Sequence, residues 1–304
     1  MKDFEIKQGD CLAKLREIEE GSIDTIVTSP PYFLMRDYGE EGQMGLEDNS
    51  TEYIESLLKV FTECKRVLRD TGSLWINIRD TYSKGLKKSG VKNKSLSMIP
   101  ERLAIRLLDD GWILRNDIIW HKPNAMPDSA KDRFTVDYEH LYFFTKKDKY
   151  YFNTAYEPFV TKKNTKVSNS KKNSKQEALL KTGMVRHGAK GTTLNDPSKW
   201  SDKGRIKRTT WSINTKTFKG AHFAVFPKEL IHVPITSGCP AQGTVLDPFC
   251  GSGTTGEVSI ENNMKFIGIE LNPEYIKIAK ERISNAITLR ENKGLVNENE
   301  HKEV

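Results

Sequence analysis

The sequence predicts an α/β fold built on a mostly parallel sheet with helices on both faces. Short apolar strands alternate along the chain with segments of helical periodicity. A glycine-rich turn at residues 251–253 follows a short apolar run and precedes a helical segment, as in nucleotide-binding α/β sheets. The 304 residues are enough to bury a full core, and a hydrophobic content of 37% argues against wholesale disorder.

The first two predicted strands flank a short helix. Residues 6–10 form the end of a strand, and residues 12–18 have apolar side chains at helical spacing up to Gly21. Residues 22–27 are rich in β-branched side chains, which favour a strand, and lead into a turn made by two prolines. Residues 33–50, rich in glycine and charge, are expected to form a loop.

Two longer helices and three strands follow. Residues 54–68 have apolar side chains at helical spacing, and residues 73–78 form an apolar strand. Residues 100–110 form a helix with Pro100 in its first turn and Gly111 just after its end. Further strands are predicted at residues 113–120 and 141–145.

The composition changes at residues 161–210, which have few large apolar side chains. This segment holds 14 Lys or Arg residues and three Asp or Glu residues, a formal charge of +11. Because the whole chain carries +7, the remainder carries −4. Such concentrated positive charge is typical of an element that binds a polyanion. A solvated, partly disordered loop without a partner is the alternative explanation.

Regular structure is predicted again from Trp211 onwards. The elements are strands at residues 243–246 and 265–269 and a helix at residues 254–262. Asn272 is suited to cap a following helix whose first residue is Pro273. The tail after Leu289 is polar and is expected to be loose.

The glycine turn is a candidate nucleotide-binding loop. Gly251 and Gly253 permit a tight turn with the backbone close to a ligand. Glu270, at the end of the next strand, can accept hydrogen bonds from both ribose hydroxyls. Residues 251–256 also spell G-x-G-x-x-G, so an NAD-dependent enzyme is an alternative. Asp247 opposes that alternative, because its carboxylate would repel a pyrophosphate.

Ser29, Pro30, Pro31 and Tyr32 follow the strand at residues 22–27. They resemble the catalytic motif of amino-group DNA methyltransferases, which act on an exocyclic amino group of cytosine or adenine. Such a group is a poor nucleophile, because its lone pair is delocalised into the ring. Acceptors aimed at its N–H groups draw it towards tetrahedral geometry, and the Ser29 hydroxyl and the Pro30 carbonyl are suitable acceptors. The prolines stiffen the loop, and the Tyr32 ring offers a surface for a flipped base. Alternatively, the same four residues are only a turn in which Tyr32 packs.

These motifs resemble those of amino-group DNA methyltransferases. Residues 29–32 resemble the family's catalytic Ser-Pro-Pro-Tyr motif, and residues 247–255 resemble its S-adenosylmethionine loop. Residues 222–230 resemble the segment that covers the cofactor, and residues 9–11 resemble the element that reaches its adenine. The resemblance also includes residues 72–78, 120–124, 133–134 and 138–139, and it leaves out residues 160–210 and the tail.

The resemblance implies a Rossmann-like S-adenosylmethionine-dependent methyltransferase fold, with a seven-stranded, mostly parallel sheet and one antiparallel strand. The catalytic motif precedes the cofactor motif, which implies the circularly permuted beta class. A cationic sulfonium, unlike a pyrophosphate, is compatible with the charge of Asp247. The implied parts are a catalytic half (1–160), a basic target-recognition insert (161–210), a cofactor-binding half (211–290) and a polar tail (291–304).

The resemblance and the charge pattern assign candidate site residues. The residues implied at the target base are Ser29, Pro30, Pro31 and Tyr32. Those implied at S-adenosylmethionine are Asp10, Cys11, Phe226, Pro227, Leu230, Asp247, Phe249, Gly251, Ser252, Gly253, Thr254, Thr255, Glu270, Leu271 and Asn272. The candidate DNA contacts are Lys122, Arg133, Lys162, Lys163, Lys171, Lys172, Lys190, Arg205, Lys207 and Arg208. Phosphate contacts give affinity and salt dependence, whereas contacts to base edges give specificity.

The implied reaction is methylation of duplex DNA at an exocyclic nitrogen of a flipped base, which needs no covalent intermediate. Serine before Pro-Pro-Tyr resembles the cytosine-N4 subset, and adenine N6 is the alternative. Attack on the cytosine ring needs a Cys after a Pro, and Cys239-Pro240 has the reverse order. An inactive DNA-binding module and an RNA methyltransferase are further alternatives.

The partners and compartment follow from the same features. The family is associated with restriction–modification systems and orphan bacterial methylases, so any restriction endonuclease would be a separate protein. The apolar runs are too short to span a membrane. The four cysteines form no C-x-x-C pair, so we expect neither a metal site nor disulfides, and a cytoplasmic location. Both a monomer and a homodimer are compatible with the sequence.

Overall fold

The computed structural model describes residues 3–37, 39–40, 42–85, 87, 90–159, 203–216 and 226–300. They belong to two compact units, one formed by Met1–Asn153 with Thr209–Val304 and the other by Thr154–Arg208. The described part of the second unit contains an antiparallel strand pair, β6 (Tyr156–Glu157) and β7 (Arg205–Ile206). Within the described ranges, no helix has both the length and the apolar composition needed to cross a membrane.

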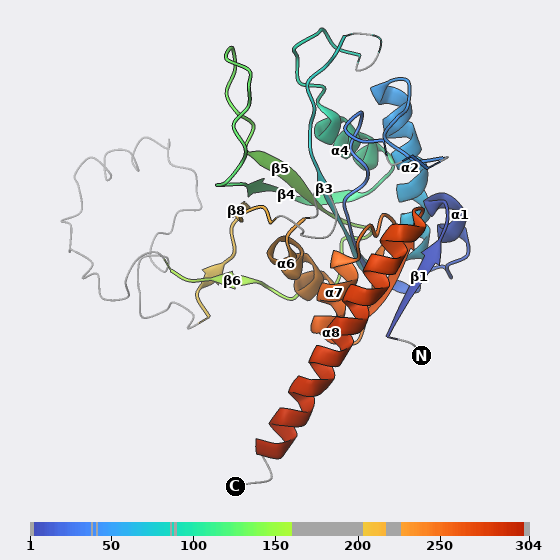
Figure 1. The fold of residues 1–304 in the computed structure, drawn as a ribbon, viewed down its shortest axis with the longest axis vertical. Helices are drawn as coiled ribbons and strands as arrows, with labels where there is room; N and C mark the ends of the chain where they lie inside the picture. Colours follow the sequence, from blue (N-terminus) through green and yellow to red (C-terminus); the bar gives the residue numbers. More distant parts are fainter. Residues whose placement is uncertain are drawn as a thin grey trace, which may run out of the picture. The chain divides into compact units, whose positions relative to one another are not determined.

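The first unit contains an eight-stranded sheet (Figure 1). Its strands are β1 (Phe4–Gln8), β2 (Ile23–Thr28), β3 (Leu68–Ile78), β4 (Ile113–His121), β5 (Tyr138–Thr145), β8 (Thr210–Ser212), β9 (Thr244–Asp247) and β10 (Lys265–Glu270). The strand order is β1-β10-β9-β2-β3-β5-β4-β8. Only β5 runs antiparallel to its neighbours. The mostly parallel sheet with one antiparallel strand is therefore confirmed, but the expected number of seven strands is wrong, because the three-residue strand β8 extends the edge beside β4.

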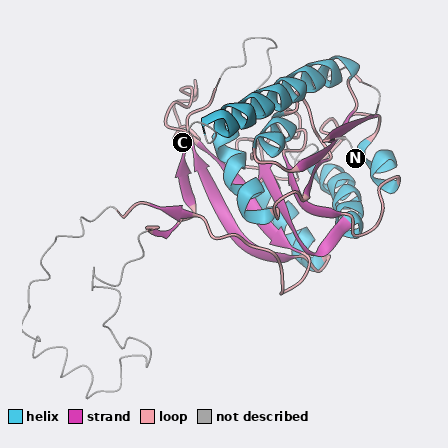
Figure 2. Ribbon diagram, turned by 90° about the horizontal axis from the view of Figure 1, so that it is seen from below, coloured by secondary structure: helices cyan, strands magenta, loops and turns pink. Residues whose placement is uncertain are grey.

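Helices cover both faces of this sheet (Figure 2). One face is covered by α1 (Cys11–Arg16), α2 (Ser50–Val67) and α4 (Ile99–Asp109). The other face is covered by α6 (Lys228–Gly238), α7 (Thr254–Glu261) and α8 (Pro273–Glu300). Strand β2 contributes to both cores, since Ile26 packs in the first and Val27 in the second. This two-sided burial explains its nearly continuous apolar sequence.

Helix α8 is longer than the sequence analysis predicts. Asn272 caps it as predicted, since its side-chain oxygen accepts from the backbone N–H of Glu274 at 2.8 Å. The loose tail expected after Leu289 is wrong up to Glu300, where the long red helix of Figure 1 ends. An existing helix is extended at low cost, because each added residue contributes a backbone hydrogen bond without a new nucleation step. Arg290 also pairs with Asp3.

Candidate active site

The carboxyl ends of five parallel strands meet at one edge of the sheet. Gln8 at the end of β1 lies opposite Glu270 at the end of β10, and β9 lies between β10 and β2. Thr28 at the end of β2 lies opposite Ile76 of β3. The residues that follow β1, β2 and β9 therefore meet at this edge, although they are far apart in sequence. Ligands of open α/β sheets bind at this edge, where the strand order reverses.

The glycine loop between β9 and α7 has the conformation that its sequence predicts. Gly251 and Gly253 have φ angles of +51° and +82°, in the left-handed region that favours glycine. A Cβ on Gly253 would come within 2.7 Å of the Cβ of Ala279 in α8. A Cβ on Gly251 would meet nothing closer than 4.0 Å. Gly253 thus allows close packing on α8, while Gly251 leaves open space on its side of the loop.

Glu270 connects the glycine loop with the start of α8. One carboxylate oxygen accepts from the backbone N–H of Gly251 at 2.8 Å, and the other accepts from that of Asn272 at 2.8 Å. Its backbone carbonyl accepts from Gly9 at 3.0 Å. Burial raises the pKa of Glu270. Each carboxylate oxygen keeps acceptor capacity for a further hydrogen bond, as binding of a ribose requires.

Asp247 is buried, with 1% of its surface exposed, and joins the glycine loop to the end of β2. Its Oδ1 accepts from the Thr28 hydroxyl at 2.7 Å and from the backbone N–H of Phe249 at 3.0 Å. Its Oδ2 accepts from the Thr255 hydroxyl at 2.6 Å. Burial raises the pKa of Asp247 to about 6. Both oxygens are engaged within the protein, and the expected contact with a cationic cofactor stays a prediction.

Arg282 of α8 holds the glycine loop from outside. Its guanidinium donates to the carbonyl and the hydroxyl of Ser252 at 2.8 Å each, and to the Thr254 hydroxyl at 3.2 Å. It also pairs with Glu257 at 2.7 Å. Sequence reasoning did not identify Arg282, because it belongs to no motif and reaches the loop across 28 to 30 positions.

The other residues implied at the cofactor lie around this edge. Asp10 caps α1, since its side chain accepts from the N–H of Ala13 at 2.8 Å. Cys11 is buried, which raises its pKa to about 12. Pro227 precedes α6, and Leu230 is fully buried in the core. Phe249, Leu271 and Phe226 are half-buried. Residues 222–225 of the covering segment lie outside the described residues.

The Tyr32 hydroxyl makes three close contacts in the candidate catalytic loop, residues 29–32. It donates to Glu139 at 2.7 Å and lies 3.2 Å from the side-chain oxygen of Asn77. The Ser29 hydroxyl donates to it at 3.3 Å. Burial and the charge of Glu139 raise the pKa of Tyr32 well above its ordinary value, so the hydroxyl keeps its proton. The structure thus joins Ser29 and Tyr32 by a hydrogen bond and adds two partners from β3 and β5. Contact of Ser29 and Tyr32 with a target base stays a prediction.

Glu139 and Lys122 form a buried ion pair beneath this loop. The side chains of Glu139 and Lys122 are 5% and 12% exposed, and the ammonium also lies 4.4 Å from the centroid of the Trp120 ring. Burial lowers the pKa of Lys122. Glu139 reaches the site because β5 is antiparallel, so that the start of β5 lies beside the ends of the parallel strands. Lys122, expected at DNA phosphate, points into the site instead, and a phosphate contact by it stays a prediction.

Among the other described candidates for DNA contact, three arginines form ion pairs with acidic residues. Arg133 pairs with Asp128 at 2.6 Å and its guanidinium lies 3.4 Å from the ring centroid of Tyr82. In the second unit, Arg205 and Arg208 both pair with Glu157. The backbone N–H of Lys207 donates to the carbonyl of Ala155 at 2.9 Å. The candidates Lys162, Lys163, Lys171, Lys172 and Lys190 lie outside the described residues.

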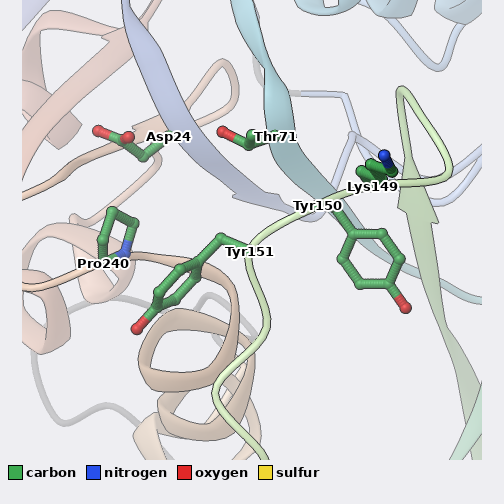
Figure 3. A pocket seen from close by; sticks show the side chains of 6 residues that line it. All are labelled: Asp24, Thr71, Lys149, Tyr150, Tyr151 and Pro240. Atoms are coloured by element: carbon green, nitrogen blue, oxygen red, sulfur yellow. The ribbon is translucent and has the colours of Figure 1, made fainter.

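A cavity of about 320 Å³ opens at the opposite edge of the sheet (Figure 3). It is lined by Asp24, Thr71, Lys149, Tyr150, Tyr151 and Pro240. Asp24 lies near the start of β2, five residues before Ser29. Its carboxylate accepts a hydrogen bond from the backbone N–H of Thr244 at 2.8 Å. It also pairs with Arg69 at 3.2 Å. The Asp24 carboxylate is therefore occupied by contacts within the fold. The cavity is separate from the candidate active site.

Comparison with known proteins decides the family. A family model described as DNA methylase, N6_N4_Mtase, matches residues 23–281. The chain belongs to this N6/N4 DNA methylase family. It is 40% identical over 301 residues to the Type II methyltransferase M.Cfr9I of Citrobacter freundii, covering 92% of this chain and 88% of that protein. It is 41% identical over 296 residues to M.XycI of Xanthomonas campestris pv. cyanopsidis, covering 91% and 86%.

Solved structures show the same fold. PvuII DNA methyltransferase (cytosine-N4-specific) aligns with this methylase with a TM-score of 0.65 and 21% identity, covering 95% of this chain and 92% of that one. M1.HpyAVI, solved as a complex with S-adenosylmethionine, aligns with a TM-score of 0.55 and 18% identity, covering 92% and 98%. The expected Rossmann-like methyltransferase fold is confirmed, and S-adenosylmethionine is the cofactor of the family. The circular permutation stays a prediction.

Proposed function

We propose that this methylase transfers a methyl group from S-adenosylmethionine to the exocyclic N4 of cytosine at a specific sequence in duplex DNA. One observation carries the proposal: Ser29 follows Thr28, whose hydroxyl is held by Asp247 of the cofactor edge at 2.7 Å. A target base at Ser29 would therefore lie beside the methyl donor. Serine in this position favours cytosine, and PvuII methyltransferase, which is similar in fold, is named as cytosine-N4-specific.

The residues at the sheet edge fit S-adenosylmethionine. When bound, this cofactor supplies an electrophilic methyl group on a sulfonium. Glu270 offers acceptors for the ribose hydroxyls while it holds the loop and the start of α8. The open space at Gly251 allows the ligand to approach the backbone. The buried carboxylate of Asp247 favours a positive charge nearby over a pyrophosphate.

The catalytic loop acts by positioning. The Ser29 hydroxyl and the Pro30 carbonyl accept hydrogen bonds from the target amino group, which directs its lone pair towards the methyl group. A base reaches this loop only when it is flipped out of the duplex, at a cost of a few kcal/mol that the protein offsets by stacking and hydrogen bonds. The proton of the methylated nitrogen leaves afterwards to water, so no side chain acts as a strong base.

Duplex DNA is the proposed substrate, and the basic segment at residues 161–210 supplies the attraction to phosphate. We place the methylase in a restriction–modification system, as the names of its Type II relatives suggest, or among orphan methylases. A restriction endonuclease would then be a separate protein that cleaves the unmethylated site.

The test is incubation with unmethylated duplex DNA and methyl-labelled S-adenosylmethionine, followed by mass spectrometry of the released nucleosides. We expect N4-methylcytosine. N6-methyladenine would retain the reaction type and contradict the choice of base. Absence of any methylated nucleoside on varied DNA, together with methylation of RNA, would overturn the proposed substrate.

A further inference from the structure

We propose that Glu139 is a positioning residue that acts through Tyr32 to fix the direction of the Ser29 hydroxyl. In this arrangement the Ser29 lone pairs face the target base and its proton does not. The inference rests on the proposed function, because it concerns the group that receives the amino hydrogen bond. Among the residues that the structure describes, Glu139 and Asp247 are the two buried carboxylates.

The chain of hydrogen bonds begins at a group that can only accept. An ionised carboxylate has no proton to donate, so the 2.7 Å contact between Glu139 and Tyr32 requires the Tyr32 hydroxyl to be the donor. The raised pKa of Tyr32 supports this assignment, because the phenol keeps its proton. The ammonium of Lys122 stabilises the ionised carboxylate by a direct ion pair.

Asn77 enforces the same direction. Its amide nitrogen donates to Glu139 and to the backbone carbonyl of His140, both at 3.1 Å. Two acceptors around the nitrogen fix the orientation of the amide, so that its oxygen lies 3.2 Å from the Tyr32 hydroxyl. Tyr32 therefore faces two acceptors on this side and has a single proton for them.

The Tyr32 oxygen can then only accept from Ser29. The Ser29 hydroxyl lies 3.3 Å away and donates its single proton to that oxygen. Within the described residues, the Ser29 hydroxyl makes no other hydrogen bond. Its lone pairs therefore stay available as acceptors for an N–H group of the substrate.

The direction of this chain has a consequence for the substrate class. An acceptor at Ser29 matches the exocyclic amino group of cytosine or adenine. A reversed chain would present the serine proton, which matches the carbonyl oxygens of thymine and guanine instead. The buried Glu139–Lys122 pair thus selects bases that carry an amino group, although neither side chain needs to touch the base.

The experiment compares single and double variants of the full-length protein. Glu139→Gln replaces the carboxylate by an amide that can also donate, and we expect kcat for DNA methylation to fall roughly 10²-fold. KM for DNA and Kd for S-adenosylmethionine should stay within about twofold, because the binding surfaces are unchanged. The matched control is Asp117→Asn, which removes the negative charge 3.0 Å from His140, the next residue of β5, and should leave kcat unchanged.

The stranded charge of Lys122 complicates the single variant, since an unpaired buried ammonium is destabilising. The double variant Lys122→Met/Glu139→Gln removes both charges of the pair. We expect it to regain thermal stability relative to Glu139→Gln while kcat stays low. A purely structural role for Glu139 predicts instead that kcat returns together with stability.

A double-mutant cycle that combines Glu139→Gln with Ser29→Ala tests whether Glu139 acts through the direction of the Ser29 hydroxyl. Without the serine hydroxyl, Glu139→Gln should lower kcat by less than twofold further, because the group that it orients is gone. Wild-type kcat in Glu139→Gln, recovery of kcat in the double variant, or fully multiplicative effects in the cycle would overturn the inference. Absence of methylation by the wild-type protein would instead overturn the proposed function.

Discussion

At the scale of single residues, the site depends on buried carboxylates that accept hydrogen bonds from hydroxyl groups. Asp247 holds Thr28, and Glu139 holds Tyr32. Both hydroxyl groups flank Ser29 in the catalytic loop, one immediately before it and one three residues after it. Because the carboxylates are buried, each orients its hydroxyl more strongly than it would in water. The two acidic residues therefore fix the geometry of a serine that carries no charge.

Substitution of Ser29 tests the catalytic assignment. Ser29→Ala removes the acceptor for the target amino group, and we expect kcat to fall by about 10²- to 10³-fold. Binding of S-adenosylmethionine, measured by calorimetry, should remain unchanged. The matched control is Ser22→Ala, just before β2, whose hydroxyl donates to the Glu19 carbonyl at 2.7 Å. Full activity of Ser29→Ala would refute the assignment.

The raised pKa of Asp247 predicts how stability depends on pH. The folded protein holds this proton up to a pH of about 6, whereas an unfolded Asp loses it near its ordinary value of 3.8. The folded state therefore binds more protons between these values, and the contribution of Asp247 to stability falls as pH rises from about 4 to about 6.

Asp247→Asn removes this titration and keeps the shape. We expect the free energy of unfolding of the wild type, relative to that of the variant, to fall by about 3 kcal/mol across this window. Chemical denaturation at several pH values between about 4 and 8 measures the difference. A difference that stays flat, or that rises with pH, would contradict the assigned burial of the charge.

The candidate site residues Ser29, Tyr32 and Glu270 could be proposed from the sequence because local motifs contain them. The sequence did not predict Thr28 or Asn77 as parts of the site. Thr28 ends a strand and is paired with a residue 219 positions away, and Asn77 meets Glu139 across 62 positions. Such partners follow from strand order and register, which a single sequence does not reveal.

At the scale of elements, α7 and α8 fix the glycine loop from its two sides. The loop opens α7, and α8 packs against both the loop and α7. Arg282 supplies the polar contacts of this packing, and Gly253 and Gly256 permit its close approach. The shape of the cofactor loop therefore depends on a helix that begins after the next strand.

Removal of Arg282 should loosen the loop. Arg282→Met keeps an unbranched apolar stem but leaves Glu257 and the loop hydroxyls without this partner. We expect a loss of about 2–4 kcal/mol of stability and weaker binding of S-adenosylmethionine. The control on the same helix is Lys277→Met, whose exposed pair with Glu274 should contribute less than about 0.5 kcal/mol. Equal effects of the two variants would show that Arg282 does not stabilise the glycine loop specifically.

Gly256 tests the packing of α7. Alanine in a helix is normally favoured over glycine by about 1 kcal/mol. Here a Cβ would lie 2.4 Å from Ile283 and 2.6 Å from Phe266, so overpacking should outweigh propensity. We expect Gly256→Ala to lower the melting temperature, and Ile283→Val to restore part of it. A higher melting temperature for Gly256→Ala alone would show that the helices can move apart.

Most elements were predictable because their periodicity is local, and the exceptions have physical reasons. Strand β8 has three residues and follows the basic segment, so no alternation is visible. Helix α6 contains Pro234, a residue that is unfavourable inside a helix, so the sequence did not indicate a helix there. Its packing between the sheet and α7 compensates for the missing hydrogen bond.

At the scale of the whole molecule, positive charge is concentrated in one segment and the remainder is acidic. Residues 161–210 carry +11 against −4 elsewhere. Uniform positive charge would attract DNA to any face, whereas this distribution favours one orientation. The fold class was predictable from the alternation of strands and helices, but the strand order, which joins β2 to β9, was not.

Affinity for DNA should depend strongly on salt. If half or more of the eight basic candidates in residues 161–210 contact phosphate, the slope of log K against log salt should lie between roughly −4 and −7. Binding titrations at several salt concentrations measure this slope. Replacing Lys162, Lys163, Lys171, Lys172 and Lys190 by Gln should make it shallower by roughly four units. An unchanged slope would assign DNA binding to another surface.

The pairing of β2 with β9 has a consequence for synthesis in the cell. Strand β2 is complete after residue 28, but its neighbour on one side ends with Asp247, 219 residues after Thr28. At ribosomal rates of 5–20 residues per second, one apolar edge of the nascent sheet stays unpaired for roughly 10 to 40 s. An unpaired strand edge is a template for association with other chains. Chaperones that shield nascent chains should therefore matter more for the yield of this protein than for its final stability.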